Sequence, residues 1–363
     1  MECMKWNMEY GMEYGINIKD FLSGSLYIPY STPFHYVASP TPLHVFFNNF
    51  WNGFIEKTDS MDCTFFITLL EKVFESPIHI SSSPDDATVL VESIFGEHSY
   101  LYHKKWSSTF LFTGEAHYCN HPHVSAYDCV LGFEETHDNR YVHCPLYLLF
   151  LQTNPFILEQ IRDGGAPAPT PPAPPPPSHA SVIISNSFHG HERMRFTQRL
   201  EEKMTVFYGG KYKNNIGGPI AGHFNSPAMN DFYKRGKFAI TMENSIGPYY
   251  ITEKLVNGLR AGVIPVYWGT DRVSEFFNPR RFFQLKSGAT DEDMSELIEK
   301  MCNLTDEEYL SIIREPIMLR SMEYVITEVS ESVKKIVIPH GPAPAPAPSP
   351  VRDFNVIMVP LHR

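Results

Sequence analysis

The sequence predicts an α/β protein with two parallel sheets. Short apolar runs alternate with segments that have the 3.6-residue spacing of amphipathic helices, a pattern typical of parallel sheets that are buried on both faces. This alternation occurs twice, once on each side of a proline-rich tract. The length of 363 residues is sufficient for two such units of about 150 residues each.

In the first half, four apolar runs predict strands and one longer segment predicts a helix. LHVFFNNFW precedes the helical pattern MDCTFFITLLEKVFE at 61–75. The remaining strands are expected in ATVLVESIFG, STFLFTGE and AYDCVLGF. Strand, helix, strand is the repeating unit of a parallel sheet.

The second half repeats the pattern. Strands are expected at 180–186, 204–210, 237–244, 262–269 and 280–285, and a helix from Arg195 to Lys203. A short helix follows Tyr250, with apolar spacing through Leu255 and Leu259, and Gly262 closes it. Residues 290–337 have the composition of further helices.

Two proline-rich tracts mark the expected boundaries. Residues 164–178 predict an extended polyproline linker, because proline disrupts both helices and sheets. A second tract lies within 341–363, which we expect to be a tail. The predicted domains are therefore 1–163 and 179–340.

Composition limits the classes of function. The formal net charge of -11 argues against broad nucleic-acid binding, although a basic pocket can exist within an acidic surface. We find no signal peptide and no apolar run near 20 residues, so we expect a cytoplasmic, soluble protein without a transmembrane segment. The six cysteines are scattered, which favours free thiols.

Lys254 is unexpected in the first turn of the short helix. A helix start carries about half a positive charge, so a cation is disfavoured there unless an anion is nearby. Exposed backbone N–H groups and an ammonium together make a phosphate site. Arg195, near the start of another helix, could add a bidentate contact to the same anion. The alternative is that both are ordinary solvated cations.

Two other strand ends carry candidate residues. Gly210 and Lys213 follow a strand, where a glycine allows close approach to a nucleotide, although neither GxGxxG nor a Walker motif is present. A simple turn is the alternative. Glu115 follows a strand and a glycine, a position suited to a general base. A surface acid or helix cap is its alternative.

Two further patterns have weaker links to function. HYCNHPHVSAYDC, with His137, His143 and Cys144 after it, contains zinc-ligand types, but its spacing fits no standard zinc site. We therefore expect no metal. The aromatic segments FNNFW and YSTPFHY could stack on sugars, although core packing is the more frequent role of such rings.

A family resemblance rests on the second half. KFAITMENSIGPYYITEKLVNGLRAGVIPVYWGTDRVSEFFNPRRFF at 237–283 closely resembles the signature region of glycosyltransferase family 10, the α1,3/4-fucosyltransferases. SNSFHGHERMRF looks like the family's asparagine-to-arginine segment and FYGGKYKNNIGG like its glycine-rich segment. FLFTGEAHY and DCVLGFEETHDNRYVHCPLY resemble bacterial-type members more weakly.

The resemblance implies a GT-B fold, in which two Rossmann-like domains face across a cleft. It implies an inverting enzyme that moves L-fucose from GDP-fucose to a hydroxyl of a glycan acceptor in α-1,3 linkage, without a cofactor or a metal. Carried over by position, Glu115 is the base. Arg195 and Lys254 bind the diphosphate, Glu253 engages the fucosyl ring, and Asn244 and Tyr250 hold the nucleotide or ribose. Gly210 and Lys213 lie in the glycine-rich segment.

Two alternatives stay open. The same fold could use another GDP sugar, because few residues contact the sugar itself. A glycan-binding protein without turnover is the other, although all the matched polar positions are present. The acceptor cannot be inferred from the resemblance, because the N-terminal half matches weakly.

Overall fold

The computed structural model describes residues 41–57, 61–115, 124–152, 175–185, 190–222 and 226–338. Residues 1–40, residues 164–174 of the expected linker and the expected tail lie outside the described residues.

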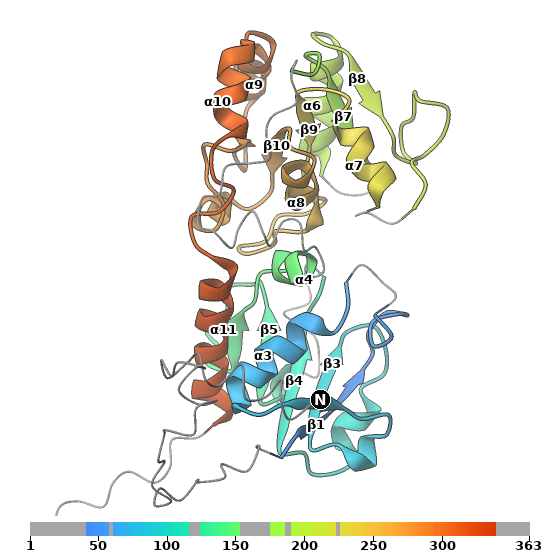
Figure 1. Ribbon diagram of the computed structural model, residues 1–363, viewed down its shortest axis with the longest axis vertical. Helices are drawn as coiled ribbons and strands as arrows, with labels where there is room; N and C mark the ends of the chain where they lie inside the picture. The colour runs from blue at the N-terminus through green and yellow to red at the C-terminus, as the bar shows by residue number, and fades with distance from the viewer. Residues whose placement is uncertain are drawn as a thin grey trace, which may run out of the picture. The chain divides into compact units, whose positions relative to one another are not determined.

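The first sheet has six parallel strands in the order β2-β1-β3-β4-β5-β6 (Figure 1). Its strands are β1 (Leu43–Asn48), β2 (Ile78–Ile80), β3 (Val89–Ser93), β4 (Ser108–Phe112), β5 (Cys129–Gly132) and β6 (Tyr141–His143). Every residue of β3, β4 and β5 is buried, which explains why these strands are mostly apolar, with buried polar residues only at the end of β3 and the start of β4. The four strands predicted in this half are confirmed. The strand β2 was missed because its sequence, IHI, is only partly buried and has the exposed His79 at its centre, so it forms no apolar run.

Among the described residues that precede the expected linker, the α-helices are α3 (Thr64–Phe74) and α4 (Tyr147–Gln152). Three short 3-10 turns lie between the strands of the first sheet, η1 (Pro84–Asp86), η2 (Ser99–Tyr102) and η3 (Val124–Ala126). The predicted helix at 61–75 corresponds to α3, whose apolar face is fully buried. The sequence reading missed α4, because YLLFLQ has no polar face to reveal a helical period.

The second sheet has five parallel strands in the order β11-β10-β9-β7-β8. Its strands are β7 (Ala180–Val182), β8 (Val206–Tyr208), β9 (Phe238–Ile240), β10 (Ile264–Trp268) and β11 (Phe283–Leu285). The helical elements are α6 (His191–Glu201), α7 (Pro227–Tyr233), α8 (Glu253–Arg260), η4 (Asp271–Glu275), α9 (Asp291–Cys302), α10 (Asp306–Ile313) and α11 (Met322–Val337). All five predicted strands are present. The helix α6 begins four residues earlier than expected.

The last helix packs on the first sheet's side of the protein. Figure 1 shows α11 beside α3, and the two helices share one hydrophobic core. Lys72 and Lys334 add ion pairs to Glu323 and Glu75. The sequence assigned 322–337 to the C-terminal domain because it follows α9 and α10 along the chain. The structure differs from that prediction, because the buried residues of α11 pack in the hydrophobic core of the first sheet.

The two sheets meet where β5 ends. The backbone N–H of Tyr249 donates to the carbonyl of Phe133 at 2.9 Å, and the rings of Phe133 and Tyr250 lie 5.0 Å apart. Arg272 forms an ion pair with Glu135 and donates to the hydroxyl of Tyr249 at 2.7 Å. The segment before α8 is thereby held against the first sheet.

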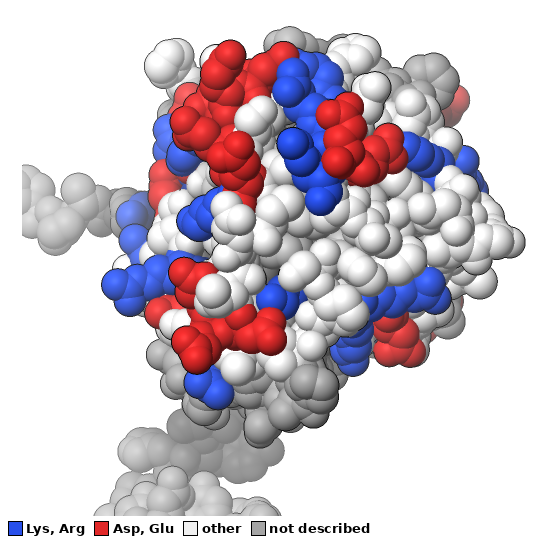
Figure 2. All heavy atoms as spheres, turned by 90° about the horizontal axis from the view of Figure 1, so that it is seen from above, with Lys and Arg blue, Asp and Glu red and all other residues white. Residues whose placement is uncertain are grey.

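Charged side chains of both signs are mixed on the face seen in Figure 2, with acidic clusters beside basic ones. Among the described residues, none of the helices combines the length and apolarity needed to cross a membrane.

Candidate active site

The candidate site is built around the segment that joins β9 to α8. After β9, the backbone N–H of Thr241 and that of Glu243 donate to the carbonyls of Val266 and Trp268, so the chain keeps following the sheet as far as Glu243. The glycine after β10, Gly269, leaves room for Glu243, because an added Cβ would lie 2.8 Å from its Cγ. The Glu243 carboxylate is thus placed at the carboxyl edge of the second sheet.

Glu243 and Lys254 form a buried ion pair that is organised by Thr252. Glu243 is fully buried and accepts from the backbone N–H of Thr252 at 2.8 Å and from its hydroxyl at 2.7 Å. The same hydroxyl accepts from Lys254 Nζ at 2.9 Å and caps α8. Lys254 Nζ lies 3.2 Å from Glu243 and 3.3 Å from Glu253. Lys254 is therefore held between two carboxylates.

The electrostatics follow from this arrangement. Burial raises the pKa of Glu243, while the Lys254 cation opposes the rise. Burial alone would lower the pKa of Lys254, but Glu243 and Glu253 outweigh it and raise that pKa above its usual value. Lys254 therefore stays charged at neutral pH.

The first-turn position predicted for Lys254 is confirmed, since α8 begins at Glu253. The sequence suggested that an external anion compensates the helix dipole. The structure shows that the chain itself supplies carboxylates for this purpose. Glu243 was missed as a site residue because a glutamate at the end of a buried strand has no local pattern that identifies its partner.

The guanidinium that lies near this pair belongs to Arg193, not to Arg195. Arg193 is 4% exposed, and its charge interacts with Glu243. The preceding Gly190 has φ +77°, and an added Cβ would lie 3.1 Å from Arg193 Nε, so the glycine makes room for this side chain.

Arg195 is exposed and pairs with Asp291 at the start of α9, as Arg199 does one turn later. Because residues two apart on a helix point about 200° away from each other, Arg193 and Arg195 face opposite sides of α6. The structure therefore brings Arg193 near the Glu243–Lys254 pair, whereas the predicted residue Arg195 pairs with Asp291. The sequence reading could not separate the two, because it started the helix at Arg195 itself.

Glu115 follows β4 and is brought to the same site. Its side chain is open to solvent, yet the protein around the carboxyl removes enough water to raise its pKa. Lys254 lowers this pKa and Glu253 raises it, so Glu115 lies within the electrostatic reach of both residues. A strand of the first sheet and a helix of the second thus contribute to one cluster.

Asn244 and Tyr250 lie beside the cluster and contact each other. The Tyr250 hydroxyl donates to the Asn244 side-chain oxygen at 3.2 Å. Burial raises the pKa of Tyr250, so the phenol stays protonated. Tyr250 also feels the charges of Lys254, Glu243, Glu115 and Glu253. These predicted residues are thus brought together with Lys254.

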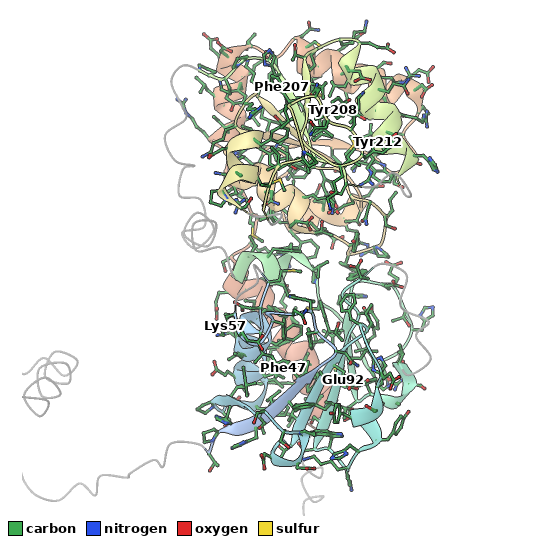
Figure 3. All side chains as sticks on the ribbon, turned by 90° about the vertical axis from the view of Figure 1, so that its right-hand side faces the viewer. Phe47, Lys57, Glu92, Phe207, Tyr208 and Tyr212 are labelled. Carbon is green, nitrogen blue, oxygen red and sulfur yellow. The ribbon has the colours of Figure 1, made fainter. Side chains whose placement is uncertain are left out.

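Gly210 and Lys213 have local roles that the sequence did not predict. An added Cβ at Gly210 would lie 2.0 Å from the backbone oxygen of Ile184, so this glycine allows close approach of the protein's own chain. Lys213 pairs with Glu201 and lies 4.3 Å from the ring centre of Tyr208. Figure 3 shows Tyr208 and Tyr212 in this region, away from the first sheet. The structure provides no contact between these residues and Lys254.

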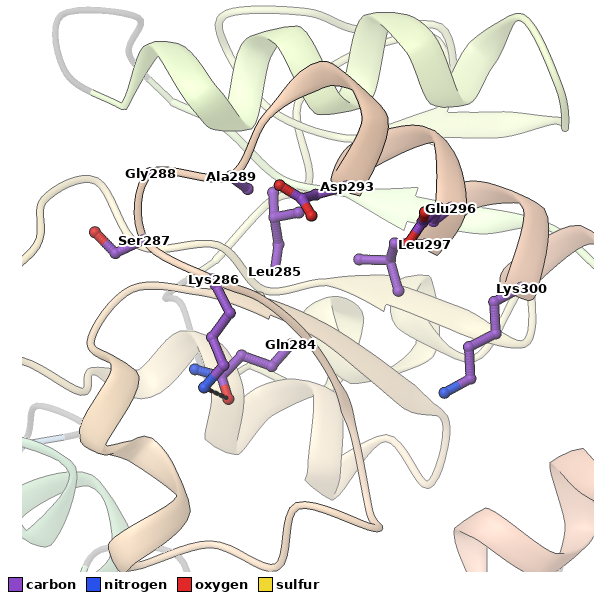
Figure 4. A pocket seen from close by; sticks show the side chains of 10 residues that line it. All are labelled: Gln284, Leu285, Lys286, Ser287, Gly288, Ala289, Asp293, Glu296, Leu297 and Lys300. Carbon is purple, nitrogen blue, oxygen red and sulfur yellow. Dashed lines mark hydrogen bonds between the residues drawn. The ribbon is translucent and has the colours of Figure 1, made fainter.

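A surface hollow of about 460 Å³ lies elsewhere, beyond β11 and along α9 (Figure 4). Its lining, which includes Lys286, Asp293 and Lys300, contains none of the predicted site residues. Within the described ranges, no cluster of three metal-ligating side chains occurs. His117, Cys119, His121 and His123 of the histidine-rich segment lie outside the described residues.

The fold resembles solved glycosyltransferases. A crystal structure of an α1,3-fucosyltransferase with GDP matches at a TM-score of 0.59 and 20% identity, covering 83% of this chain and 93% of that chain. The form with GDP-fucose matches at a TM-score of 0.55 and 20% identity, covering 87% and 95%. Two parallel-sheet domains of this kind define the class of GT-B glycosyltransferases, and the predicted GT-B fold is confirmed.

Sequence comparison narrows the class to a family. Residues 176–314 match the model described as glycosyltransferase family 10 (fucosyltransferase) C-term. The α-(1,3)-fucosyltransferase FucT of Helicobacter pylori is 25% identical over 277 residues, covering 67% of this chain and 54% of that protein. The putative fucosyltransferase R654 of Acanthamoeba polyphaga mimivirus is 32% identical over 109 residues, covering 29% and 18%. Residues 176–314 therefore resemble the C-terminal region of glycosyltransferase family 10, and the chain spans about half the length of the first of these relatives.

Proposed function

We propose that this protein is an inverting fucosyltransferase that uses GDP-fucose and forms an α-1,3 linkage to a glycan hydroxyl. One observation carries the proposal. A buried Glu243–Lys254 pair at the start of α8 lies within electrostatic reach of Arg193 and of Glu115, in a chain whose residues 176–314 match the family 10 model. A relative named α-(1,3)-fucosyltransferase supports the linkage, and a structural neighbour solved with GDP-fucose supports the donor.

In this mechanism, Lys254 and Arg193 neutralise the charge that develops on the departing diphosphate. Such fixed charges stabilise a developing negative charge more strongly in a site from which water is excluded than they would in water. Thr252, Glu243 and Glu253 already take up the three donor hydrogens of the Lys254 ammonium, so a diphosphate would displace one of these partners when it binds. We propose that these cations make a metal unnecessary. If they do, a chelator should leave the rate of transfer unchanged.

Glu115 takes the proton of the acceptor hydroxyl while that oxygen attacks the anomeric carbon of fucose. The C–O bond forms as the bond to the diphosphate breaks, which inverts the anomeric centre. The raised pKa of Glu115 strengthens it as a base. Glu253, beside Lys254, faces the partial positive charge on the sugar ring, and Asn244 and Tyr250 hold the nucleotide or ribose.

The test is release of GDP and transfer of labelled sugar from GDP-fucose, GDP-mannose and GDP-rhamnose, with a panel of glycan acceptors. We expect GDP-fucose to be preferred and the product to carry an α-1,3 linkage. A preference for another GDP sugar would favour the alternative donor. Absence of both hydrolysis and transfer, with glycan binding retained, would indicate a binding protein instead.

A further inference from the structure

Three neighbouring strands of the first sheet end at one edge. β1 pairs with β3, which pairs with β4, so the loops 49–57, 94–98 and 113–115 follow adjacent strands. Adjacent strands lie about 4.8 Å apart, so the loop after β1 is roughly 10 Å from the strand that leads to Glu115. A molecule that reaches Glu115 along this edge would pass over the loops after β3 and β1.

The aromatic rings at this edge fall into two groups. Phe47 and Phe54 are buried, and Phe50 stacks on Phe54 with ring centres 4.0 Å apart, so these rings belong to the core. Trp51 is half-buried and Phe95 is 51% exposed, and their ring centres lie 6.2 Å apart at 76°. These two rings form an exposed pair, which we call the aromatic platform.

The aromatic platform is held in place from both sides. Trp51 Nε1 donates to the carbonyl of Met61 at 2.9 Å, which fixes the orientation of the indole. The side-chain amide of Asn49 donates to the carbonyl of Glu97 at 2.8 Å and joins the two loops. A surface hollow of about 370 Å³ is lined by residues 47–56. Binding at Trp51 would cost little ordering entropy, because the indole is already held in place.

Buried polar groups support the strands beneath. Glu92 near the end of β3 is fully buried and accepts from Asn48 at the end of β1 and from Tyr127, each at 2.5 Å. Figure 3 shows Glu92 and Phe47 together within the first sheet. The edge that carries the aromatic platform is therefore rigidly connected to the sheet.

We propose that the aromatic platform of Trp51 and Phe95 binds the acceptor glycan, with one sugar ring stacked on it while the reactive hydroxyl of a neighbouring ring lies at Glu115. This inference rests on the proposed transferase function. Aromatic rings suit the apolar C–H faces of a pyranose, and the indole N–H is already satisfied by Met61. The span of roughly 10 Å requires an acceptor of at least two sugar rings.

The test compares Phe95→Ala with Tyr324→Ala. The control residue is also an exposed aromatic, 50% exposed, but it lies on α11. The probes are a 4-galactosyl-N-acetylglucosaminide and the N-acetylglucosaminide without galactose, each with GDP-fucose. We expect Phe95→Ala to raise the KM for the disaccharide about threefold to tenfold, as for loss of an aromatic contact. The KM for the monosaccharide, the KM for GDP-fucose and the rate of donor hydrolysis should change less than about twofold, and Tyr324→Ala should change none of them.

An equal rise in KM for both acceptors, or no rise for either, would contradict the proposal that the aromatic platform binds the acceptor. Calorimetric binding of the disaccharide in the presence of GDP separates this failure from failure of the proposed function. If wild type does not turn over GDP-fucose but binds the disaccharide and Phe95→Ala does not, the platform stands and the transferase does not. If wild type hydrolyses GDP-fucose yet neither binds nor modifies the disaccharide, the platform is wrong.

Discussion

Replacing Lys254 by alanine should cost stability as well as activity, because it leaves the Glu243 carboxylate buried without its cation. The two groups are 3.2 Å apart, and Glu243 is fully buried. At an effective dielectric constant near 20, their attraction is about 5 kcal/mol before desolvation is counted. Breaking a buried pair costs roughly 3–5 kcal/mol. Thr252 still donates two hydrogen bonds to Glu243 and Lys254 is 24% exposed, so we expect the lower end, about 3 kcal/mol.

The penalty should depend on pH in a defined direction. Burial already raises the pKa of Glu243 above its unfolded value, and loss of Lys254 raises it further. A carboxyl whose folded pKa is raised makes the fold less stable as pH increases from the unfolded to the folded pKa. The difference between wild type and Lys254→Ala should therefore be largest at pH 8 and should shrink toward pH 5, by at most about 1.4 kcal/mol per unit.

The assay is urea unfolding of both proteins at pH 8 and pH 5, followed by tryptophan fluorescence. The double variant Lys254→Ala with Glu243→Gln removes the orphaned charge, so it should recover most of the stability while staying inactive. A Lys254→Ala protein as stable as wild type at both pH values would refute the structural role of the pair. Lower stability that the double variant fails to recover would show that the loss comes from packing and not from charge.

The remaining predictions concern three other residues. Arg193→Lys should lower kcat/KM by about tenfold or more, because a lysine cannot reproduce a bidentate contact with phosphate. The control Arg195→Lys should change kcat/KM less than about twofold. Equal effects of the two substitutions would contradict the proposal that Arg193 binds the diphosphate. Glu115→Gln should reduce the rate of transfer by about 10²–10⁴-fold, while the affinity for GDP stays within about twofold of wild type. In the wild type, the rate should fall on the acid side at a pH above 4.5, because the base must be deprotonated and the pKa of Glu115 is raised. Gly210→Ala should destabilise the protein by about 1–3 kcal/mol in urea unfolding, because the new Cβ would lie 2.0 Å from the backbone oxygen of Ile184. The control for backbone strain alone is Gly217→Ala, because its Cβ would meet nothing within 4 Å while its φ is +92°.

Strands and most helices could be predicted from the sequence, because burial on both faces leaves mostly apolar runs. The central strands β3, β4 and β5 illustrate this clearly. The limits of α8 were also predictable, since Thr252 caps its start and Gly262 has φ +71° after its end. The strand β2 was not predictable, because the exposed His79 interrupts its apolar run, and the seven residues of α7 are too few to show a helical period.

The site was predictable only where a residue's own position carried the signal. Lys254 conflicts with the helix dipole and could be recognised from its neighbours in sequence. The partner of Lys254 could not be recognised, because Glu243 reaches it through a turn that only the folded chain defines. Likewise, which of Arg193 and Arg195 faces the site depends on the rotation of α6 about its axis. An error of a few residues in the predicted start of the helix is enough to exchange the two faces.

The docking of α11 on α3 also has a consequence for synthesis of the chain. Lys72 and Glu323 are joined across 251 positions of sequence, and the core of the first sheet contains Met322, Val325 and Val333. At about 5–20 residues per second on the ribosome, that core waits tens of seconds for its last helix. During this interval, the apolar face of α3 lacks its final cover. Nascent chains stalled before residue 322 should therefore be more prone to chaperone capture than chains released after residue 338.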